Sequence, residues 1–277
     1  MLTRESKAGP RRAVLGGVIL CAGILVVFAV GAAQDSEPEP RALPTTTEPL
    51  GISPQADRIL REMGDFLKRA KEFTFRAEVA YDSVQSGGQK LQFGGVSDVS
   101  VRRPNRLHVE YRGDERKSRV VYDGKKFFLH DLAANVYSST DISAPLDEAI
   151  DLIFEKYGFS VPVADLVHSD VYGTLTESVR SGHLVGRHEV DGTLCNHLAF
   201  TQEGIDWQIW IEDGPRPLPR KLLITYKDEE GSPQYSARFT RWDLKPSFSD
   251  STFRFQPQAG ADQIEFLSAQ QSQEVHP

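Results

Sequence analysis

The sequence predicts an α+β fold made mostly of antiparallel β structure: an incomplete, open β-barrel or strongly curved sheet with an N-terminal helix and a helical lid insertion. Three observations predict this class. Many segments alternate apolar and polar residues with the two-residue period of a strand. One amphipathic helical pattern precedes these segments, and a second helical region interrupts them at about residues 145–177.

The chain begins with an expected export signal. Residues 13–33 carry no charged side chain, and at about 1.5 Å per residue a helix of this length can span a hydrocarbon core of about 30 Å. The flanking charges are basic before the segment and acidic after it: Arg4, Lys7, Arg11 and Arg12, then Asp35, Glu37 and Glu39. By the positive-inside rule, the N-terminus is expected in the cytoplasm and the rest of the chain on the far side of the membrane.

Residues 1–33 are expected to act either as a cleaved signal peptide or as a retained membrane anchor. Gly31-Ala32-Ala33 offers the small residues that a signal peptidase needs, whereas the apolar run is longer than a usual signal-peptide core, which favours the anchor. Leu20 is too bulky to precede a lipidated Cys21, and the Arg11-Arg12 pair lacks the rest of a twin-arginine signal. Export by the Sec route is therefore favoured.

The charge of the exported part argues against nucleic acid as a partner. Removing the four basic residues and the one acidic residue of positions 1–33 from the totals leaves 28 Lys and Arg against 38 Asp and Glu, a net charge of −10. An acidic protein does not attract phosphate backbones. Cys195 is the one cysteine of this part, so no intrachain disulfide is expected there and stability has to come from a packed core.

A tether and a helix come before the first strand. Residues 34–54 include five prolines among Glu and Thr, a composition that buries too little apolar surface to offset chain entropy, so a disordered tether is expected. From Pro54, apolar residues recur at helical spacing and predict an amphipathic helix that docks on the sheet: Ile59, Leu60, Met63, Phe66, Leu67 and Ala70. The folded domain is expected to span 55–267, followed by a disordered tail at 268–277.

The strands are predicted from segments in which apolar and polar residues alternate. Phe73, Phe75, Ala77, Val79 and Tyr81 alternate with polar residues, and the same period returns at 107–111 and 205–211. Further strands are expected at 90–102, 116–123, 125–131, 134–140, 182–190, 193–201, 219–228, 234–243 and 251–256. The dipeptides Asp123-Gly124 and Asp191-Gly192 suit primed hairpin turns, so neighbouring strands are expected to be antiparallel.

The second helical region is the expected lid. Its apolar residues keep a helical period: Leu146, Ala149, Ile150, Ile153, Phe154 and Tyr157. Gly158 and Pro162 stop and restart the helix.

No motif predicts an enzyme or a cofactor, and the best candidate for a metal site is incomplete. Cys195 and His197 are two residues apart on an expected strand, so their side chains share a face, and His188 can lie across the hairpin. A closed zinc site needs four ligands, and His183 or Asp191 would have to bend in. The alternative is a buried thiol beside hydrogen-bonded imidazoles.

The concave face of the sheet is expected either to be filled by core packing or to hold an apolar cavity for a ligand. Trp207 belongs to the inward set of its strand, and Trp210 projects from the opposite face. A curved sheet closed by amphipathic helices can leave its concave face unfilled, although core packing is the simpler interpretation. The candidate ligand-lining residues are Phe75, Val79, Leu107, Val109, Trp207, Ile209, Leu222, Ile224 and Phe239.

Several segments carry a family resemblance. Residues 103–111 and 121–125 resemble paired early strands of the LolA/LolB-like periplasmic lipoprotein carriers, and 210–213 with 218–222 resembles a later strand and turn of that superfamily. The segment 207–221 is similar to the hallmark of a bacterial predicted-periplasmic family, domain of unknown function 2092. The same family's pattern is present at 131–137, 195–200 and 264–267.

The resemblance implies an open barrel whose hydrophobic interior binds acyl chains under a helical lid. No functional residue is carried over, because the carriers' inward arginine and lid residues match no definite positions here.

Three hypotheses remain at this point. The first is a non-enzymatic periplasmic protein that holds a lipid, a lipoprotein acyl chain or another apolar ligand in the open barrel. The second is a membrane-anchored interaction or sensor module of the bacterial cell envelope with a filled core. The third, a zinc-binding protein, uses His188, Cys195 and His197.

Overall fold

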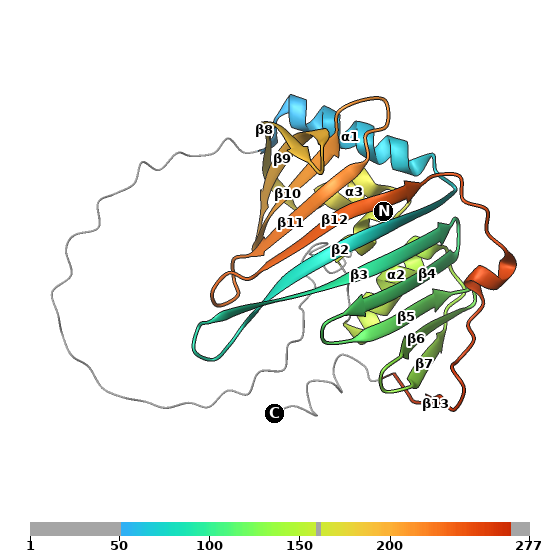
Figure 1. The fold of residues 1–277 in the computed structure, drawn as a ribbon. Helices are drawn as coiled ribbons and strands as arrows, with labels where there is room; N and C mark the ends of the chain where they lie inside the picture. The colour runs from blue at the N-terminus through green and yellow to red at the C-terminus, as the bar shows by residue number, and fades with distance from the viewer. Residues whose placement is uncertain (1–50, 159–161, 267–277) are drawn as a thin grey trace, which may run out of the picture.

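A computed structural model of the chain describes residues 51–158 and 162–266 (Figure 1). The predicted export segment 13–33 and the predicted tail 268–277 lie outside these residues, as does most of the predicted tether. Within the described ranges, no helix is long and apolar enough to cross a membrane.

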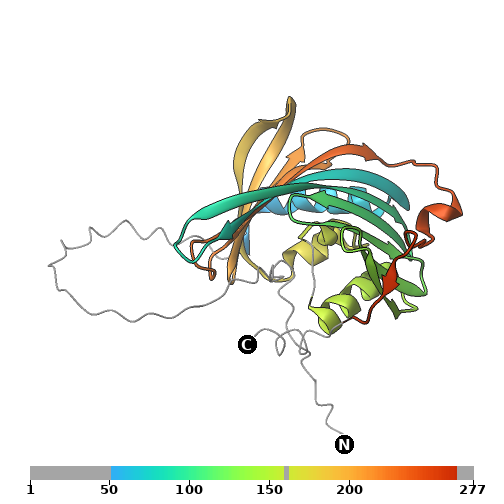
Figure 2. The same ribbon diagram turned by 60° about the horizontal axis from the view of Figure 1, so that its bottom comes forward.

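The fold is one large curved sheet of thirteen strands that does not close into a barrel, which confirms the predicted class (Figures 1 and 2). In their order across the sheet the strands are β1 (Gly51–Ile52), β8 (Val179–Val190), β9 (Thr193–Gln202), β10 (Ile205–Glu212), β11 (Pro219–Tyr226), β12 (Gln234–Asp243), β2 (Glu72–Val84), β3 (Lys90–Arg102), β4 (Arg106–Gly113), β5 (Lys117–Tyr122), β6 (Lys126–Asp131), β7 (Val136–Asp141) and β13 (Asp262–Gln263). All pairs are antiparallel except β1 with β8 and β13 with β7, at the two edges.

The register of the strands places their apolar residues side by side on the concave face. Phe75 of β2 lies opposite Val99 of β3, which lies opposite Val109 of β4. In the other half, Trp207 of β10 lies opposite Ile224 of β11. Because side chains alternate between faces along a strand, these pairings place one apolar row after another on the side that the helices cover.

The N-terminal helix forms as its residue spacing predicts. Helix α1 (Pro54–Lys68) begins at Ser53, whose hydroxyl accepts a hydrogen bond from the backbone N–H of Ala56 at 3.4 Å, and Pro54 occupies the first helical turn. Its apolar stripe is completely buried at Leu60, Met63 and Leu67, among other residues. The helix therefore closes one part of the concave face.

The predicted helical insertion consists of α2 (Leu146–Tyr157), the 3₁₀ turn η1 (Pro162–Leu166) and α3 (Val171–Thr176). Helix α2 ends at Gly158, whose φ of 69° is the left-handed conformation that glycine adopts without a steric cost. Arg103, directly after β3, holds the insertion in place by donating to the carbonyls of Val167 and His168 at 2.7 and 2.8 Å. All three helices lie on the concave side of the sheet (Figure 2).

The predicted strand at 251–256 is wrong. Residues 250–253 form the 3₁₀ turn η2 (Asp250–Phe253), and the chain then continues as an extended segment. The Ser249 hydroxyl lies 2.7 Å from that of Ser251, a local hydrogen bond that favours a turn over a strand. Residues 244–266, named here the C-terminal strap, cross the convex face and reach the β7 edge of the sheet (Figure 1).

One of the two predicted primed turns is present. Asp191 and Gly192 have φ values of 49° and 75°, as a type I′ turn requires. At Asp123-Gly124 only Gly124 has positive φ, and the Asp123 carboxylate accepts instead from the backbone N–H groups of Lys125 and Lys126. The side-chain bonds of Asp123 stabilise a longer loop there.

Candidate functional site

The nine predicted lining residues all lie on the concave face, but they differ in how far they are covered. Eight of them are buried, with exposed fractions from 0% to 8%, and Val109 alone is half-buried. Leu60 and Met63 of α1 and Leu166 of η1 belong to the same apolar cluster as Trp207. The β8–β12 half of the concave face is therefore a packed core.

The β4–β6 half is less completely covered. Val109, Val120 and Leu129 lie opposite one another in three neighbouring strands and are all half-buried. Ile150 and Tyr157 of α2, also half-buried, pack against the same cluster, and α2 lies beneath these strands in Figure 2. We name these five residues the concave strip. The sequence predicted Val109 as a lining residue and Ile150 and Tyr157 as apolar residues of the lid. It did not single out Val120 and Leu129, although the alternation in 116–123 and 125–131 marked the two strands that contribute them.

A row of tyrosines lies beside the concave strip. Tyr235 of β12 is paired with Tyr81 of β2, whose hydroxyl donates to Glu115 at 2.5 Å, and burial raises the pKa of both phenols. Tyr111 of β4 and Tyr226 of β11 extend the row in both directions, and burial raises the pKa of Tyr226 to about 12. The row therefore gives the apolar face neutral hydroxyl groups.

The predicted metal candidates meet on the convex face as a histidine pair. The Nδ1 atoms of His188 and His197 lie 3.0 Å apart, so one of them donates a hydrogen bond to the other. Trp210 stacks on the His197 ring at 4.0 Å, and the Nε2–H of His197 donates to Gln208 at 2.9 Å. Burial lowers the pKa of His197, which keeps the ring neutral at pH 7.

Cys195 is a free, buried thiol. Its thiol donates to the carbonyl of Thr193 at 3.3 Å, and burial raises its pKa to about 11. The thiolate is the form of cysteine that acts as a nucleophile or binds a metal ion. A pKa of about 11 disfavours the thiolate of Cys195 at neutral pH. Over the described ranges, no three His, Cys, Asp or Glu residues are grouped so that they could hold a metal ion.

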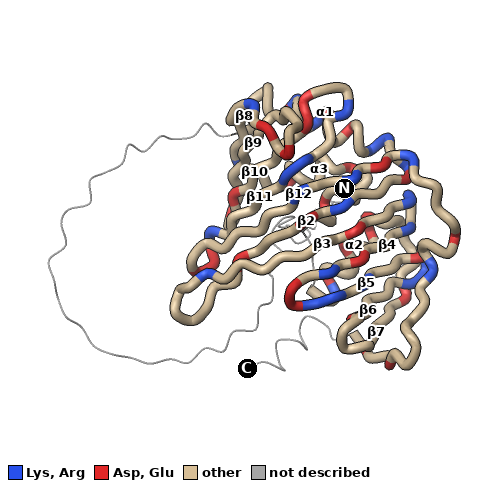
Figure 3. The backbone as a smooth tube through the Cα atoms, viewed as in Figure 1, with Lys and Arg blue, Asp and Glu red and all other residues tan. Residues whose placement is uncertain are grey.

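The rest of the convex face is covered by paired charges. Basic and acidic residues are interspersed along β2–β5 in Figure 3. Arg76 donates to Asp98 at 2.7 Å, which lowers the pKa of that carboxyl, and Arg119 lies 2.8 Å from Glu110. Basic and acidic side chains therefore neutralise one another along these strands.

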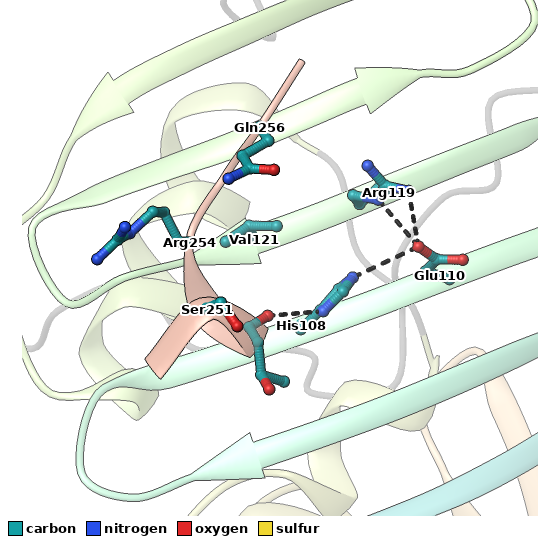
Figure 4. Close-up of a pocket in the computed structure, with 8 residues that line it drawn as sticks. His108, Glu110, Arg119, Val121, Ser251, Arg254 and Gln256 are labelled. Atoms are coloured by element: carbon teal, nitrogen blue, oxygen red, sulfur yellow. Dashed lines mark hydrogen bonds and ion pairs between the residues drawn. The ribbon is translucent and has the colours of Figure 1, made fainter. Parts of the chain in front are cut away.

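A shallow pocket of about 370 Å³ lies between the convex face and the C-terminal strap (Figure 4). Its lining residues are His108, Glu110, Arg119, Val121, Ser251, Thr252, Arg254 and Gln256. The Nδ1–H of His108 donates to the carbonyl of Thr252 at 2.8 Å, and Glu110 is paired with Arg119. The His108–Thr252 hydrogen bond attaches the strap to the sheet, and the Glu110–Arg119 pair joins β4 to β5, so we assign the pocket to packing of the strap.

Several solved structures resemble this chain at low sequence identity. An uncharacterized conserved protein from Thermus thermophilus has a TM-score of 0.46 at 10% identity, over 76% of this chain and 99% of that one. The lipoprotein LppX of Mycobacterium tuberculosis scores 0.43 at 16% identity, over 71% and 99%. A LolA superfamily protein from Nitrosomonas europaea scores 0.37 at 10% identity, over 72% and 97%.

The family follows from sequence. No curated protein matches this chain in sequence. The model of one family does match it, over residues 56–267, and that family is described as predicted periplasmic proteins. This match confirms the family that the resemblance indicated and supports a periplasmic location. The chain therefore belongs to the family of predicted periplasmic proteins known as domain of unknown function 2092.

Proposed function

We propose that the protein is a non-enzymatic periplasmic protein that binds a lipid, a lipoprotein acyl chain or another apolar ligand against the concave strip, beneath α2. The observation that carries the proposal is the incomplete cover of Val109, Val120 and Leu129, which form a continuous apolar row. Each methylene removed from water contributes about 0.8 kcal/mol, so one acyl chain supplies ample affinity without a charged partner.

The packed half of the interior limits where the ligand lies. Trp207, Ile209 and Ile224 are 0% exposed and belong to one apolar cluster with residues of α1 and η1, so a ligand there would have to displace the core. In the proposal, α2 moves to admit the ligand. Its residues Leu146, Ala149 and Ile153 are buried, whereas Ile150 and Tyr157 of the concave strip are half-buried. We therefore place the ligand between α2 and β4–β6.

Lipid mass spectrometry of the protein recovered from the cell envelope tests the proposal. We expect co-purified lipid at a stoichiometry near one, and a several-fold loss of lipid in Val120→Asp. The matched control is Leu223→Asp, since Leu223 is also a half-buried aliphatic residue but lies on the opposite face of the sheet. Equal lipid content in both variants, or no lipid in the unaltered protein, would contradict the proposal.

A second candidate is an interaction or sensor module anchored to the inner membrane through residues 13–33. The eight buried lining residues favour it, because a filled core leaves recognition to the surface. Intact-mass measurement of the protein recovered from membranes tests the anchor: a chain that retains residues 1–33 supports it. A chain cleaved near Ala33 supports a diffusing carrier instead.

A further inference from the structure

We propose that Arg116 and Glu115, in the turn between β4 and β5, bind the head group of a zwitterionic lipid, one that carries a phosphate and an ammonium group, while its acyl chain lies along the concave strip. This inference rests on the proposed function and specifies its ligand class. It starts from the end of the concave strip that lies away from the attachments of α2.

Both ends of helix α2 are attached to the same end of the sheet strands. The backbone N–H of Leu146 donates to the carbonyl of Pro104 in the β3–β4 turn at 2.7 Å. At the other end of the helix, the Tyr157 hydroxyl donates to Thr140 at 3.0 Å, and Thr140 lies opposite Phe127, next to the β5–β6 turn. The β4–β5 turn is at the opposite end of these strands, so the concave strip opens towards it.

The residues that follow the concave strip towards this turn are polar. Tyr111 comes after Val109 on the concave side of β4, and it lies opposite Ser118, which comes before Val120 on the concave side of β5. Both polar residues are half-buried. An acyl chain against Val109 and Val120 therefore ends beside two hydroxyl groups, which can replace hydrogen bonds that a polar head group loses on leaving water.

Two glycines make room for the Tyr111 ring against the sheet. A Cβ atom built on Gly95 of β3 would lie 2.6 Å from the Tyr111 hydroxyl oxygen, and one built on Gly113 of β4 would lie 2.6 Å from its Cζ atom. The ring therefore occupies the places of two missing side chains and lies along the strands. This placement keeps the ring from blocking the end of the concave strip.

Arg116 and Glu115 carry opposite charges and contact different tyrosines. The Arg116 guanidinium lies over the Tyr111 ring, with its Cζ atom 5.6 Å from the ring centroid. Oε2 of Glu115 accepts a hydrogen bond from the Tyr81 hydroxyl at 2.5 Å. Over the described ranges, the side-chain contacts of these two residues are thus with aromatic groups and not with each other. Each charge is therefore available to a ligand.

The other charges at this end favour a head group of both signs over an anion. Asp131, which lies opposite Ser118, and Asp114 accept hydrogen bonds from uncharged backbone N–H groups at 2.7 to 2.9 Å, so both keep their negative charge. Figure 3 shows acidic and basic residues together at the β4–β5 turn. A phosphate can pair with Arg116 while an ammonium group lies among the carboxylates, whereas an anion alone would be repelled by them.

Competition between lipids that share one lauroyl chain tests the inference. The protein, produced from the full-length gene and recovered as the host processes it, is loaded with the apolar fluorophore 1-N-phenylnaphthylamine. Zwitterionic lysophosphatidylethanolamine, anionic lysophosphatidylglycerol and uncharged monolauroylglycerol then displace it at pH 7.5, each below its micelle-forming concentration. We expect lysophosphatidylethanolamine to compete about threefold to tenfold better than either of the others, the gain from two partly exposed charge contacts. Added salt should reduce this preference.

Variants in the turn separate the two charges. Arg116→Gln should reduce the preference for lysophosphatidylethanolamine over monolauroylglycerol to about twofold or less, because the phosphate loses its partner. Glu115→Gln can still accept from Tyr81, and it should remove most of the preference over lysophosphatidylglycerol, because the ammonium group loses its partner and the anion loses a repelling neighbour. Lys117→Gln is the matched control: it removes one positive charge beside Arg116, but Lys117 alternates with Ser118 onto the convex face and should not affect the preference.

Two kinds of result overturn the inference. Equal or better competition by lysophosphatidylglycerol or monolauroylglycerol with the unaltered protein does so, as does an unchanged preference in both Arg116→Gln and Glu115→Gln. In either case, displacement of the fluorophore by all three lipids still supports the proposed function. If neither the fluorophore nor any of the three lipids binds, the proposed function fails and the inference fails with it.

Discussion

Gly64 of α1 lies so close to Tyr172 of α3 that a Cβ atom built on Gly64 would be 2.7 Å from the Cβ of Tyr172. The two helices are therefore in backbone contact at this point. The neighbouring Asp57 and Arg61 side chains also bond to the Tyr172 hydroxyl, the latter at 2.8 Å. This contact fixes α3, and with it one end of the helical insertion, to the N-terminal helix.

Gly64→Ala should destabilise the protein. The added methyl group forces α1 and α3 apart, which costs about 1–3 kcal/mol and outweighs the gain of up to about 1 kcal/mol in helix propensity. Urea unfolding measures the change. The control is Gly87→Ala in the β2–β3 turn, where a Cβ atom meets nothing within 4 Å and stability should stay within about 0.5 kcal/mol. An equally stable Gly64→Ala variant would contradict the close contact.

Acid should weaken the fold through two histidines. Burial lowers the pKa values of His108 and His197 below their usual 6.5, so the unfolded chain binds protons more readily than the folded protein. Their contribution to the free energy of unfolding is complete above about pH 6.5 and falls as the pH drops below that value towards the folded-state pKa values.

The variants His108→Asn and His197→Gln isolate this effect. Each should show a smaller loss of stability between pH 7.5 and 5.5 than the unaltered protein, because one proton-binding site has been removed from the unfolded state. Asn and Gln can keep the hydrogen bonds that Nδ1 of His108 and Nε2 of His197 make to Thr252 and Gln208. A pH slope identical to that of the unaltered protein would show that neither histidine titrates differently on folding.

Cys195 should react slowly with thiol reagents. A rise of its pKa from 9.0 to about 11 reduces the thiolate fraction at pH 8 by about a hundredfold, and burial of the side chain adds to this. Peptide mass spectrometry after timed iodoacetamide labelling distinguishes Cys195 from Cys21. Denatured protein is the reference for the unhindered rate, and comparable rates in both states would refute the buried environment.

The strands and the N-terminal helix could be predicted because their signals are local. The alternation from Phe73 to Tyr81 and the spacing from Ile59 to Leu67 give face and period directly, and β3 has the predicted bounds 90–102. The segment 251–256 shows the limit of this method. Phe253 and Phe255 alternate as in a strand, but they pack against the convex face of the sheet instead of pairing with a neighbour.

The candidate site was predicted only in part, for a related reason. Trp207, Ile209 and Val109 have the same alternation in sequence, so the pattern assigns all three to the concave face. Whether a residue there is sealed or half-covered depends on how the helices pack against the sheet. Helix α1 contacts β10, which carries Trp207 and Ile209, whereas α2 lies beneath β4, which carries Val109 (Figure 2). That arrangement depends on contacts such as Arg103 with Val167, which connect segments 64 residues apart.

The C-terminal strap should restrain the lid. It passes from the convex face, where Phe255 stacks on Phe128 at 4.3 Å, to the β7 edge, where Phe266 stacks on Tyr157 of α2 at 4.6 Å. Phe266→Ala removes the stack that joins the strap to α2, so hydrogen exchange in residues 146–157 should accelerate several-fold while β2 and β3 keep their protection.

Ile264→Ala is the matched control, because Ile264 lies on the same strap but is 49% exposed. It should leave exchange in α2 unchanged. If Phe266→Ala also leaves it unchanged, the strap does not hold α2. In Phe266→Ala, faster hydrogen exchange in α2 together with faster release of the bound apolar fluorophore 1-N-phenylnaphthylamine would connect the strap to ligand release, since the proposed ligand lies between α2 and the sheet.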